Sequence, residues 1–401
     1  MKQILKISFA LFWLLLLMNC GKLTKGELLL DKEQIEVPTV SATSTVEVDT
    51  YGSWTVATRG PSGFNIIWVT ANPSSGKGRT TVNLTVKDNE TFDERVAKVV
   101  FMGDYGKTAS VKIIQQGRSV DPDAVAEIRV GNFNIRISTD EDYKTGNGWD
   151  LRKEKVFAAV DKIDFDIFGF QEVSGKGNGG IVGDAMQTDL CDNLGDEYEF
   201  KFFSPYSEDG NGRSSNGFAY KRDKFTMSDY RFFWISDTPN IMERNDGSHN
   251  RGGCCAVFTH KETGIRFFFM ESHAPLDKTI NDNLAHVYPD LERLYNPDGL
   301  PSLFVGDLNN YPTSDAYQVY TAWWKDAYAT LLPYGKVTGP SGTFNGFNTA
   351  ADMNTKGRID YIFYRGEIEP LHYTCDDSLY DGHYPSDHLP IYCDFRISTK
   401  E

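Results

Sequence analysis

The stretch Leu303–Asn309, LFVGDLN, starts as an apolar run and ends in two polar side chains that lie two positions apart. Side chains alternate between the two faces of a β-strand, so the row that starts at Leu303 is expected to carry Asp307 and Asn309 on one face. A row that starts in a core and ends in an acid and an amide delivers polar groups to the rim of a sheet. We therefore expect a cleft at this end of the strand.

Two more apolar runs end in the same manner. The first leads to Gly131–Asn134, GNFN, and the second leads to Gln171 and Glu172. Two further polar motifs, Arg358–Tyr361 (RIDY) and Ser386–Pro390 (SDHLP), also adjoin apolar runs. The predicted one-face rows are Ile128, Val130, Asn132 and Asn134 in the first run, and Phe168, Phe170 and Glu172 in the second. Strands that all finish in such groups at one edge predict a hydrolytic metal site there.

Length and charge narrow the class of protein. The chain has 401 residues, of which 40% are hydrophobic, and this length exceeds one ordinary core, so two domains are expected. Its formal net charge is -15 and its pI is near 5.0. Such a balance disfavours a nucleic-acid-binding protein that relies on a broad basic face. It leaves room for a local positive site that holds one phosphate.

The N-terminus has the pattern of a targeting segment. Two lysines precede a short apolar run, Ile7–Met18, which is typical of a signal peptide rather than of a membrane span. The stretch Leu17–Gly21, LMNCG, resembles a bacterial lipobox, which implies cleavage before Cys20 and lipidation of its thiol. We thus predict a lipoprotein signal peptide over residues 1–19, and a membrane-anchored lipoprotein in the periplasm or on the cell surface of a Gram-negative bacterium. An ordinary cleaved signal with a chance cysteine is the alternative.

Five cysteines follow Cys20, and an odd number leaves at least one thiol free if all pairing is internal. Cys254 and Cys255 are neighbours in a predicted strand and should point to opposite faces, which argues against a bond between them. The pairing of the others stays open.

Residues 27–117 are rich in Thr, Val and Ser, with alternating apolar positions separated by turn signals. This pattern is typical of a small immunoglobulin-like β-sandwich. It resembles the BACON domain of secreted Bacteroidetes proteins, and the family's name implies carbohydrate as a partner. We favour a spacer that holds the next domain away from the membrane, with Trp54 and Trp68 in the core. The motifs that carry the resemblance are Trp54–Val56, Ile67–Val69, Asn72–Gly76, Asn89 with Arg95, and Ile114–Gly117.

After a short polar linker, residues 126–401 alternate between strand-like and helix-like segments. Such an order predicts mixed sheets with helices outside. The expected helices are about Asp150–Lys162 and near Ala185–Leu194, with one more before Leu303. The expected strands are one ending at Asn134, then Asp166–Gln171, Gly217–Tyr220, Phe225–Ile235, Cys254–Thr259, Ile265–Met270 and Leu303–Gly306, and two final ones around Asp360 and after His388.

Taken in chain order, the polar motifs resemble those of the endonuclease/exonuclease/phosphatase superfamily, which includes pancreatic deoxyribonuclease, neutral sphingomyelinases and deadenylases. The resemblance covers residues 126–398 and includes two further motifs, Phe233–Pro239 and Glu271–Pro275. It implies an α/β fold, a four-layer sandwich in which two central β-sheets pack face to face with helices outside. It also implies a metal-dependent phosphoric ester hydrolase.

The resemblance assigns a metal role to Glu172 and places Asn134 and Asp387 next to the ion. Magnesium is the expected cofactor, with manganese as the alternative, because a small oxygen-seeking ion needs only one or two carboxylates plus substrate phosphate. Asp307 matches the proton-transferring carboxylate, and Asn309 the group that orients the phosphoryl. The remaining matches are His388, which hydrogen-bonds the scissile phosphate, and Asp360, which holds its ring.

Two more residues match phosphate-contacting groups of the superfamily, namely His273 and Arg251 in the stretch Arg251–Phe258. One departure stands beside them: deoxyribonuclease-like members have a glutamate where this chain has Asn216, and that glutamate partners the histidine equivalent to His273. Asn216 can form hydrogen bonds but supplies no charge. The detailed role of His273 therefore stays open.

Three functions fit these observations. The favoured one is an exported, lipid-anchored, magnesium-dependent phosphoesterase, with a tilt towards a compact or lipid phosphoester. A secreted nuclease is the first alternative, and a non-catalytic surface glycan-binding protein is the second. The completeness of the expected site argues against the last, and nothing in the sequence indicates a protein partner.

Overall fold

The computed structural model describes residues 27–174, 186–210, 214–242 and 250–399. Its contacts divide the chain into two units, residues 1–118 and residues 119–401, called here the N-terminal and the C-terminal unit. The predicted signal peptide and Cys20 lie outside the described residues. Within the described ranges, no helix has the length and apolarity that crossing a membrane requires.

The N-terminal unit is a β-sandwich, as predicted. Its core contains Trp54 and Phe101, and Trp68 packs at the edge with the guanidinium of Arg95 4.3 Å from its ring centre. Trp54 thus lies in the core, as predicted, whereas Trp68 is only partly buried and packs against the core. One sheet has the order β1 (Leu28–Leu30), β3 (Ala42–Thr50), β7 (Thr80–Val86), β5 (Val69–Asn72), and the other β2 (Gln34–Val37), β9 (Thr108–Gln115), β8 (Arg95–Gly103), β4 (Ser53–Arg59), β6 (Ser75–Lys77).

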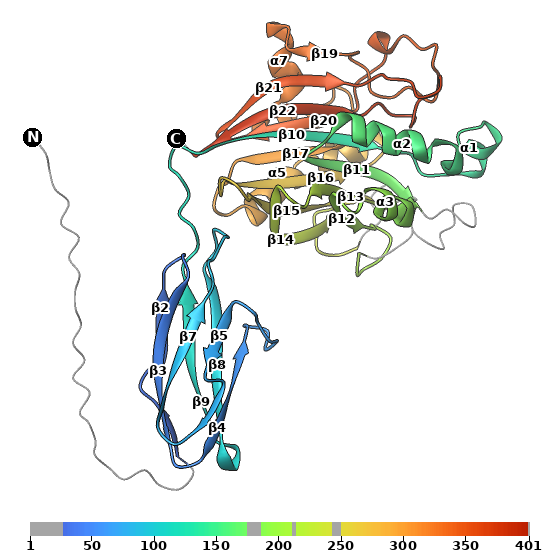
Figure 1. The fold of residues 1–401 in the computed structure, drawn as a ribbon. Coiled ribbons are helices and arrows are strands. Elements are labelled where there is room, and N and C mark those ends of the chain that lie inside the picture. The colour runs from blue at the N-terminus through green and yellow to red at the C-terminus, as the bar shows by residue number, and fades with distance from the viewer. Residues whose placement is uncertain (1–26, 175–185, 211–213, 243–249, 400–401) are drawn as a thin grey trace, which may run out of the picture. The chain divides into compact units, whose positions relative to one another are not determined.

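The C-terminal unit contains two larger sheets (Figure 1). The seven-stranded sheet has the order β12 (Tyr198–Phe203), β13 (Ser214–Lys221), β11 (Ile167–Ser174), β10 (Val125–Asn134), β22 (Ile391–Ser398), β21 (Ile368–Cys375), β19 (Val337–Thr338). The six-stranded sheet has the order β14 (Phe225–Trp234), β15 (Gly252–His260), β16 (Arg266–His273), β17 (Ser302–Asp307), β20 (Asp360–Arg365), β18 (Lys325–Asp326).

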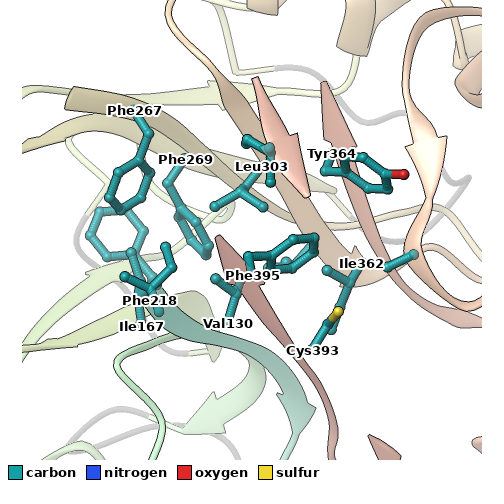
Figure 2. Close-up of a cluster of buried hydrophobic side chains, with 14 of the residues drawn as sticks. Val130, Ile167, Phe218, Phe267, Phe269, Leu303, Ile362, Tyr364, Cys393 and Phe395 are labelled. Carbon is teal, nitrogen blue, oxygen red and sulfur yellow. The ribbon is translucent and has the colours of Figure 1, made fainter. Parts of the chain in front are cut away.

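The two sheets face each other across one apolar core. Figure 2 shows part of it, with Val130 and Phe395 from the first sheet near Phe269 and Leu303 from the second. The helices are α1 (Asp140–Lys144), α2 (Trp149–Ile163), α3 (Met186–Leu194), α4 (Lys278–Leu284), α5 (Val287–Tyr295), α6 (Asp315–Trp323) and α7 (Ala327–Leu331). Separate apolar clusters join α2 and α3 to the first sheet, and α5 and α6 to the second. The unit is therefore the four-layer α/β sandwich that the sequence predicted.

One predicted row was wrong. Phe168 and Phe170 on β11 face the helices, whereas Ile167 and Gln171 point towards the other sheet. The register of β11 against β13 shifts after Phe170, and Glu172 has a positive φ of 62°. This bulge turns Glu172 back to the inner side, which simple alternation cannot anticipate.

Two further predictions to compare with the structure concern the cysteines and the set of strands. Cys254 belongs to the core between the sheets and Cys255 to the outer cluster, so they point to opposite faces as predicted. All five cysteines in the described residues are free thiols. The sequence interpretation missed four described strands of this unit, β12, β18, β19 and β21, and β21 contains Pro370 beside a register shift. A proline normally argues against an inner strand, and here the irregularity accommodates it.

Candidate active site

Polar side chains replace apolar ones at one end of the core between the two sheets. On β10 the inward row changes from Val130 to Asn132 and Asn134, and on β17 it ends in Asp307. The amide nitrogen of Asn134 lies 3.0 Å from Oδ2 of Asp307, so the two sheets are in direct polar contact here. The strand ends thus meet at one rim, as the sequence predicted.

His388 and Asp360 form a buried pair at this rim. Nδ1 of His388 lies 2.9 Å from Oδ2 of Asp360, and its Nε2 lies 3.7 Å from Oδ2 of Asp307. Burial opposes the charged imidazole, but Asp360 and Asp307 outweigh it and raise the pKa of His388 well above its usual value. The ring is therefore cationic at neutral pH, with Nε2 turned towards Asp307.

Asp307 is the most perturbed acid of the rim. Its Oδ2 accepts from Asn134, and its Oδ1 accepts the backbone N–H of Asn309 at 3.2 Å. Burial raises its pKa to about 7, and the nearby carboxylates of Asp360 and Glu172 add to this rise although His388 opposes it. A carboxyl group that titrates near neutrality can exchange a proton with water during turnover.

Glu172 approaches the same point from β11. Its Oε1 accepts from the amide of Asn134 at 3.1 Å, and its Oε2 accepts the backbone N–H of Ile137 at 3.2 Å. Burial would raise the pKa of Glu172, but the charge of Arg136 leads the opposing contributions and the pKa is lowered. Glu172 is thus an anion ready to hold a cation.

Three residues of the rim have the left-handed backbone that favours glycine. Arg136 has φ 61°, Glu172 has φ 62° and Asn309 has φ 49°. Such conformations cost free energy in residues with a Cβ and tend to occur where function requires a particular geometry. Their coincidence at one edge supports a functional site.

Arg136 is the main residue that the sequence interpretation missed. Its Nη1 lies 3.7 Å from Glu172 and 3.6 Å from Asp387, and its Nη2 lies 3.2 Å from Asp142. Arg136 follows Asn134 by two positions in the motif FNIR, and an arginine just past a strand end full of ligands was the signal available. The cation balances two of the carboxylates assigned to the metal side.

Arg152 holds the backbone around Arg136. This buried guanidinium donates to the carbonyl oxygens of Ile135 and Arg136, and to that of Pro385 at 3.3 Å. Burial lowers the pKa of Arg152 to about 10, and it stays charged at neutral pH. It therefore joins the loop after β10 to the loop that carries Asp387.

His273 and Arg251 also reach the rim. Nη1 of Arg251 lies 2.8 Å from Nε2 of His273, which in turn lies 3.4 Å from Oδ2 of Asp307. A guanidinium only donates, so Nε2 of His273 accepts and its ring proton resides on Nδ1. Asn216 directs its amide to Glu271 and to the carbonyl of Gly252.

Oxygen donors around Glu172 and Asp307 fit a divalent cation. Donor atoms of Glu172, His273 and Asp307 lie within 4.8 Å of one another. Burial is the main cause of the raised pKa of Asp307, and the carboxylates of Asp360 and Glu172 add to it. Asn134 turns its nitrogen to these carboxylates, because its oxygen accepts the backbone N–H of Arg136 at 3.0 Å. Asp387 approaches the same nitrogen of Arg136, Nη1, as Glu172 does. Its role beside the metal, and that of Asn134, stay predictions.

Solved structures with the same fold include two proteins from Bacteroides thetaiotaomicron. An endonuclease/exonuclease/phosphatase family protein from Bacteroides thetaiotaomicron has 24% identity and a TM-score of 0.59, covering 70% of this chain and 97% of that one. A mannosyl-6-phosphatase from the same organism has 25% identity and a TM-score of 0.56, covering 67% of this chain and 99% of that one.

Mouse nocturnin is 23% identical over 274 residues, which are 63% of this chain and 59% of the mouse protein. An uncharacterized protein of Acanthamoeba polyphaga mimivirus is 26% identical over 299 residues, 60% of this chain and 40% of the viral protein. The chain thus matches only about half of the length of these curated relatives.

Family models match both units. The BACON model, described as a putative N-terminal binding domain, matches residues 53–116. The model of the Endonuclease/Exonuclease/phosphatase family matches residues 131–388, a range that begins before Asn134 and ends at His388. With well over half of its length in that match, this chain belongs to the endonuclease/exonuclease/phosphatase family.

Proposed function

We propose that this protein is a metal-dependent phosphoesterase that hydrolyses a compact phosphoester outside the cytoplasm. The observation that carries the proposal is the convergence on one buried rim of Asp307, with a pKa near neutrality, and the cationic ring of His388, which Asp360 holds. An acid that exchanges protons beside a fixed positive charge suits attack by water on a phosphoryl group.

Each residue has a task in the proposed reaction. Asp307 accepts a proton from the attacking water as the water oxygen bonds to phosphorus and the ester P–O bond breaks, and the leaving oxygen takes up a proton from solvent. Nε2 of His388 donates a hydrogen bond to a phosphoryl oxygen as negative charge grows there. Asp360 keeps the imidazole oriented through Nδ1. Arg251 donates to another phosphoryl oxygen while His273 holds its guanidinium in place, and Asn309 orients the phosphoryl group.

A divalent ion bound at Glu172 would neutralise charge on the phosphoryl group, and magnesium is proposed with manganese as the alternative. Glu172 suits this role because it is anionic and shares the amide of Asn134 with Asp307. The amide of Asn134 donates to both Glu172 and Asp307 and so fixes the distance between these two carboxylates.

A sugar phosphate is the proposed compact substrate. A Bacteroides mannosyl-6-phosphatase shares 25% of its residues with this chain over nearly its whole length. The acidic net charge of -15 suits a small substrate better than a long polyanion. Phe344, which is 44% exposed and packs edge-on against His388 with ring centres 5.1 Å apart, offers an apolar surface beside the phosphate position.

Export and anchoring form a separate part of the proposal. The lipobox-like stretch ending at Cys20 supports a lipid anchor, and the N-terminal unit then serves as a spacer, with carbohydrate binding as its alternative role. Replacement of Cys20 by serine is expected to abolish labelling with a palmitate analogue and to release the protein from membranes. A mature protein that lacks Cys20 in the wild type would contradict the anchor.

An activity panel tests the reaction itself. The full chain is assayed with magnesium on hexose phosphates, inositol phosphates, sphingomyelin, plasmid DNA and RNA, and again with excess chelator. His388→Ala should lose activity, whereas His286→Ala, at an exposed histidine paired with Asp237, should retain it. Full turnover in chelator, or full activity of His388→Ala, would contradict the proposal.

A further inference from the structure

Behind the rim, two amides form a reciprocal pair. Nδ2 of Asn132 donates to Oε1 of Gln171 at 3.1 Å, and Nε2 of Gln171 donates to Oδ1 of Asn132 at 2.8 Å. Each amide has one N–H left, and these two point to carboxylates at opposite ends. Asn132 donates to Oδ1 of Asp360 at 3.2 Å, and Gln171 donates to Oε1 of Glu271 at 2.8 Å. All four side chains are buried.

The active site fixes, at one end of this row of hydrogen-bonded side chains, which groups donate and which accept. Asp360 is a carboxylate that accepts from His388, so Asn132 must offer an N–H to it rather than an oxygen. That orientation obliges Gln171 to direct its own free N–H towards Glu271. A flip of either amide would bring two oxygen atoms together and leave a buried N–H without an acceptor, which is costly.

Glu271 is built into the core as the acceptor at the other end. It lies on the inward row of β16 with Phe267 and Phe269, and it also accepts from Asn216 at 2.9 Å. Burial raises the pKa of its carboxyl group well above the usual value, and the neutral form still offers a carbonyl oxygen to Gln171. The network therefore depends on an acceptor oxygen at Glu271.

The backbone leaves room for this arrangement. A Cβ added at Gly169 on β11 would lie 2.7 Å from Cγ of Glu271 and 3.0 Å from Oδ1 of Asn132. The network also joins both sheets, because Asn132 and Gln171 belong to one sheet, and Glu271 and Asp360 to the other. It forms the polar layer directly beneath the rim.

We propose that Glu271 is a positioning residue for His388, which it orients through Gln171, Asn132 and Asp360. Loss of the acceptor at Glu271 frees the Gln171 amide to turn, and the Asn132 amide can then turn with it. Asp360 loses a hydrogen bond and holds the imidazole less firmly. The kinetic part of this inference rests on the proposed role of His388, whereas the structural part does not.

The first test is a proton NMR measurement on the full chain with ¹⁵N-labelled histidine, in which the Nδ1–H signal of His388 is assigned by its loss in His388→Ala. We expect Glu271→Ala to shift or broaden this signal and Glu271→Gln to restore it, since glutamine keeps an oxygen for Gln171. The control is Glu292→Ala, another buried glutamate, bonded to Trp323 far from the rim. It should leave the signal unchanged.

Kinetics give the second readout. Glu271→Ala should lower kcat about 10-fold, as outer-shell partners of catalytic groups do, while KM stays close to the wild-type value and Glu271→Gln recovers most of the rate. Because Gln171 and Glu271 act in series, Gln171→Met combined with Glu271→Leu should be no slower than either single variant.

The outcomes separate the inference from the proposed function. If the wild type turns over no phosphoester, the proposed function fails, and the NMR comparison still tests the link from Glu271 to His388. An unchanged His388 signal in folded Glu271→Ala, or the same change in Glu292→Ala, would overturn the positioning role. Additive rate losses in the Gln171 and Glu271 double variant would overturn it too.

Discussion

Burial of Asp307 gives its carboxyl group a pKa suited to proton transfer, at the expense of the stability of the folded protein. Burial, assisted by Asp360 and Glu172, raises its pKa to about 7. Because proton transfer at Asp307 is central to the proposed reaction, Asp307→Asn should lower kcat at least ~10²-fold on any substrate found. Steady-state kinetics of a variant with wild-type circular dichroism provide the measurement. Full activity would remove Asp307 from the mechanism.

The same shift predicts how stability depends on pH. The folded pKa of Asp307 is about 7 against a reference of 3.8, so the native state holds this proton more tightly than the unfolded state. The stability that this tightly held proton contributes is fully present below the reference pKa of 3.8, and it is lost as the pH rises through about 7. Without divalent ions, Asp307→Asn should therefore gain stability relative to wild type between pH 5 and pH 8, by about the lost contribution. Denaturant titrations check this, with exposed Asp298→Asn as the control.

Glu172 makes a prediction about metal binding that needs no substrate. A ligand that binds only the folded state stabilises it by about 2.7 kcal/mol at 100 times Kd. Saturating magnesium or manganese should raise the Tm of the wild type, and Glu172→Gln should remove most of this rise. Glu199→Gln, at a glutamate bound by Lys201 on the same sheet, is the control. Equal Tm shifts in wild type and Glu172→Gln would exclude Glu172 as the ligand.

Site residues that adjoin strand ends could be predicted from the sequence. Site residues whose role depends on contacts between distant segments could not. Asp307, Asp360 and His388 adjoin apolar runs, the family resemblance assigned them to one site, and the structure brings them together. Arg136 depends on which loops meet, because its partners come from three separate segments. Glu271 could be identified from the sequence only as one residue of a motif, because its partners Gln171 and Asn216 come from the opposite sheet.

At the level of elements, periodicity succeeded where segments were regular. The expected helix at 150–162 corresponds to α2, and the expected strand at 303–306 to β17. Periodicity failed at β21, because Pro370 made that segment look unlike a strand. It also failed at the bulge of β11, because the backbone conformation there, and not the alternation of side chains, determines the direction of Glu172. Local irregularity was the part that the pattern of residues did not reveal.

The close packing of β11 under the rim gives a prediction for this element. A Cβ at Gly169 would approach Val305 to 2.6 Å and Glu271 to 2.7 Å, and both are held in the core. Gly169→Ala should cost about 1–3 kcal/mol in the free energy of unfolding, as overpacking does. The control is Gly103→Ala, where the nearest atom is at an ordinary 3.5 Å. Equal stability of Gly169→Ala and wild type would contradict the packing.

For the whole molecule, two independent resemblances predicted two folds, and both family matches agree with them. The substrate could not be predicted in the same manner, because the fold positions the phosphoryl group and leaves the rest of the substrate to surrounding loops. Charge is the global property that bears on this choice. A net charge of -15 repels a long polyanion unless several local cations compensate.

Salt dependence turns that argument into a measurement. A protein that contacts several phosphates of a nucleic acid releases a counterion at each, and its affinity falls steeply with salt, by about 10³–10⁵ for six to ten contacts between 50 and 200 mM. A compact phosphoester offers one phosphate to the cations of the rim, so KM for a sugar phosphate should change only a few-fold over this range. Plasmid DNA assayed in parallel gives the comparison. If DNA is cleaved more efficiently than every small or lipid phosphoester at moderate salt, the compact-substrate proposal is wrong and local cations outweigh the acidic surface.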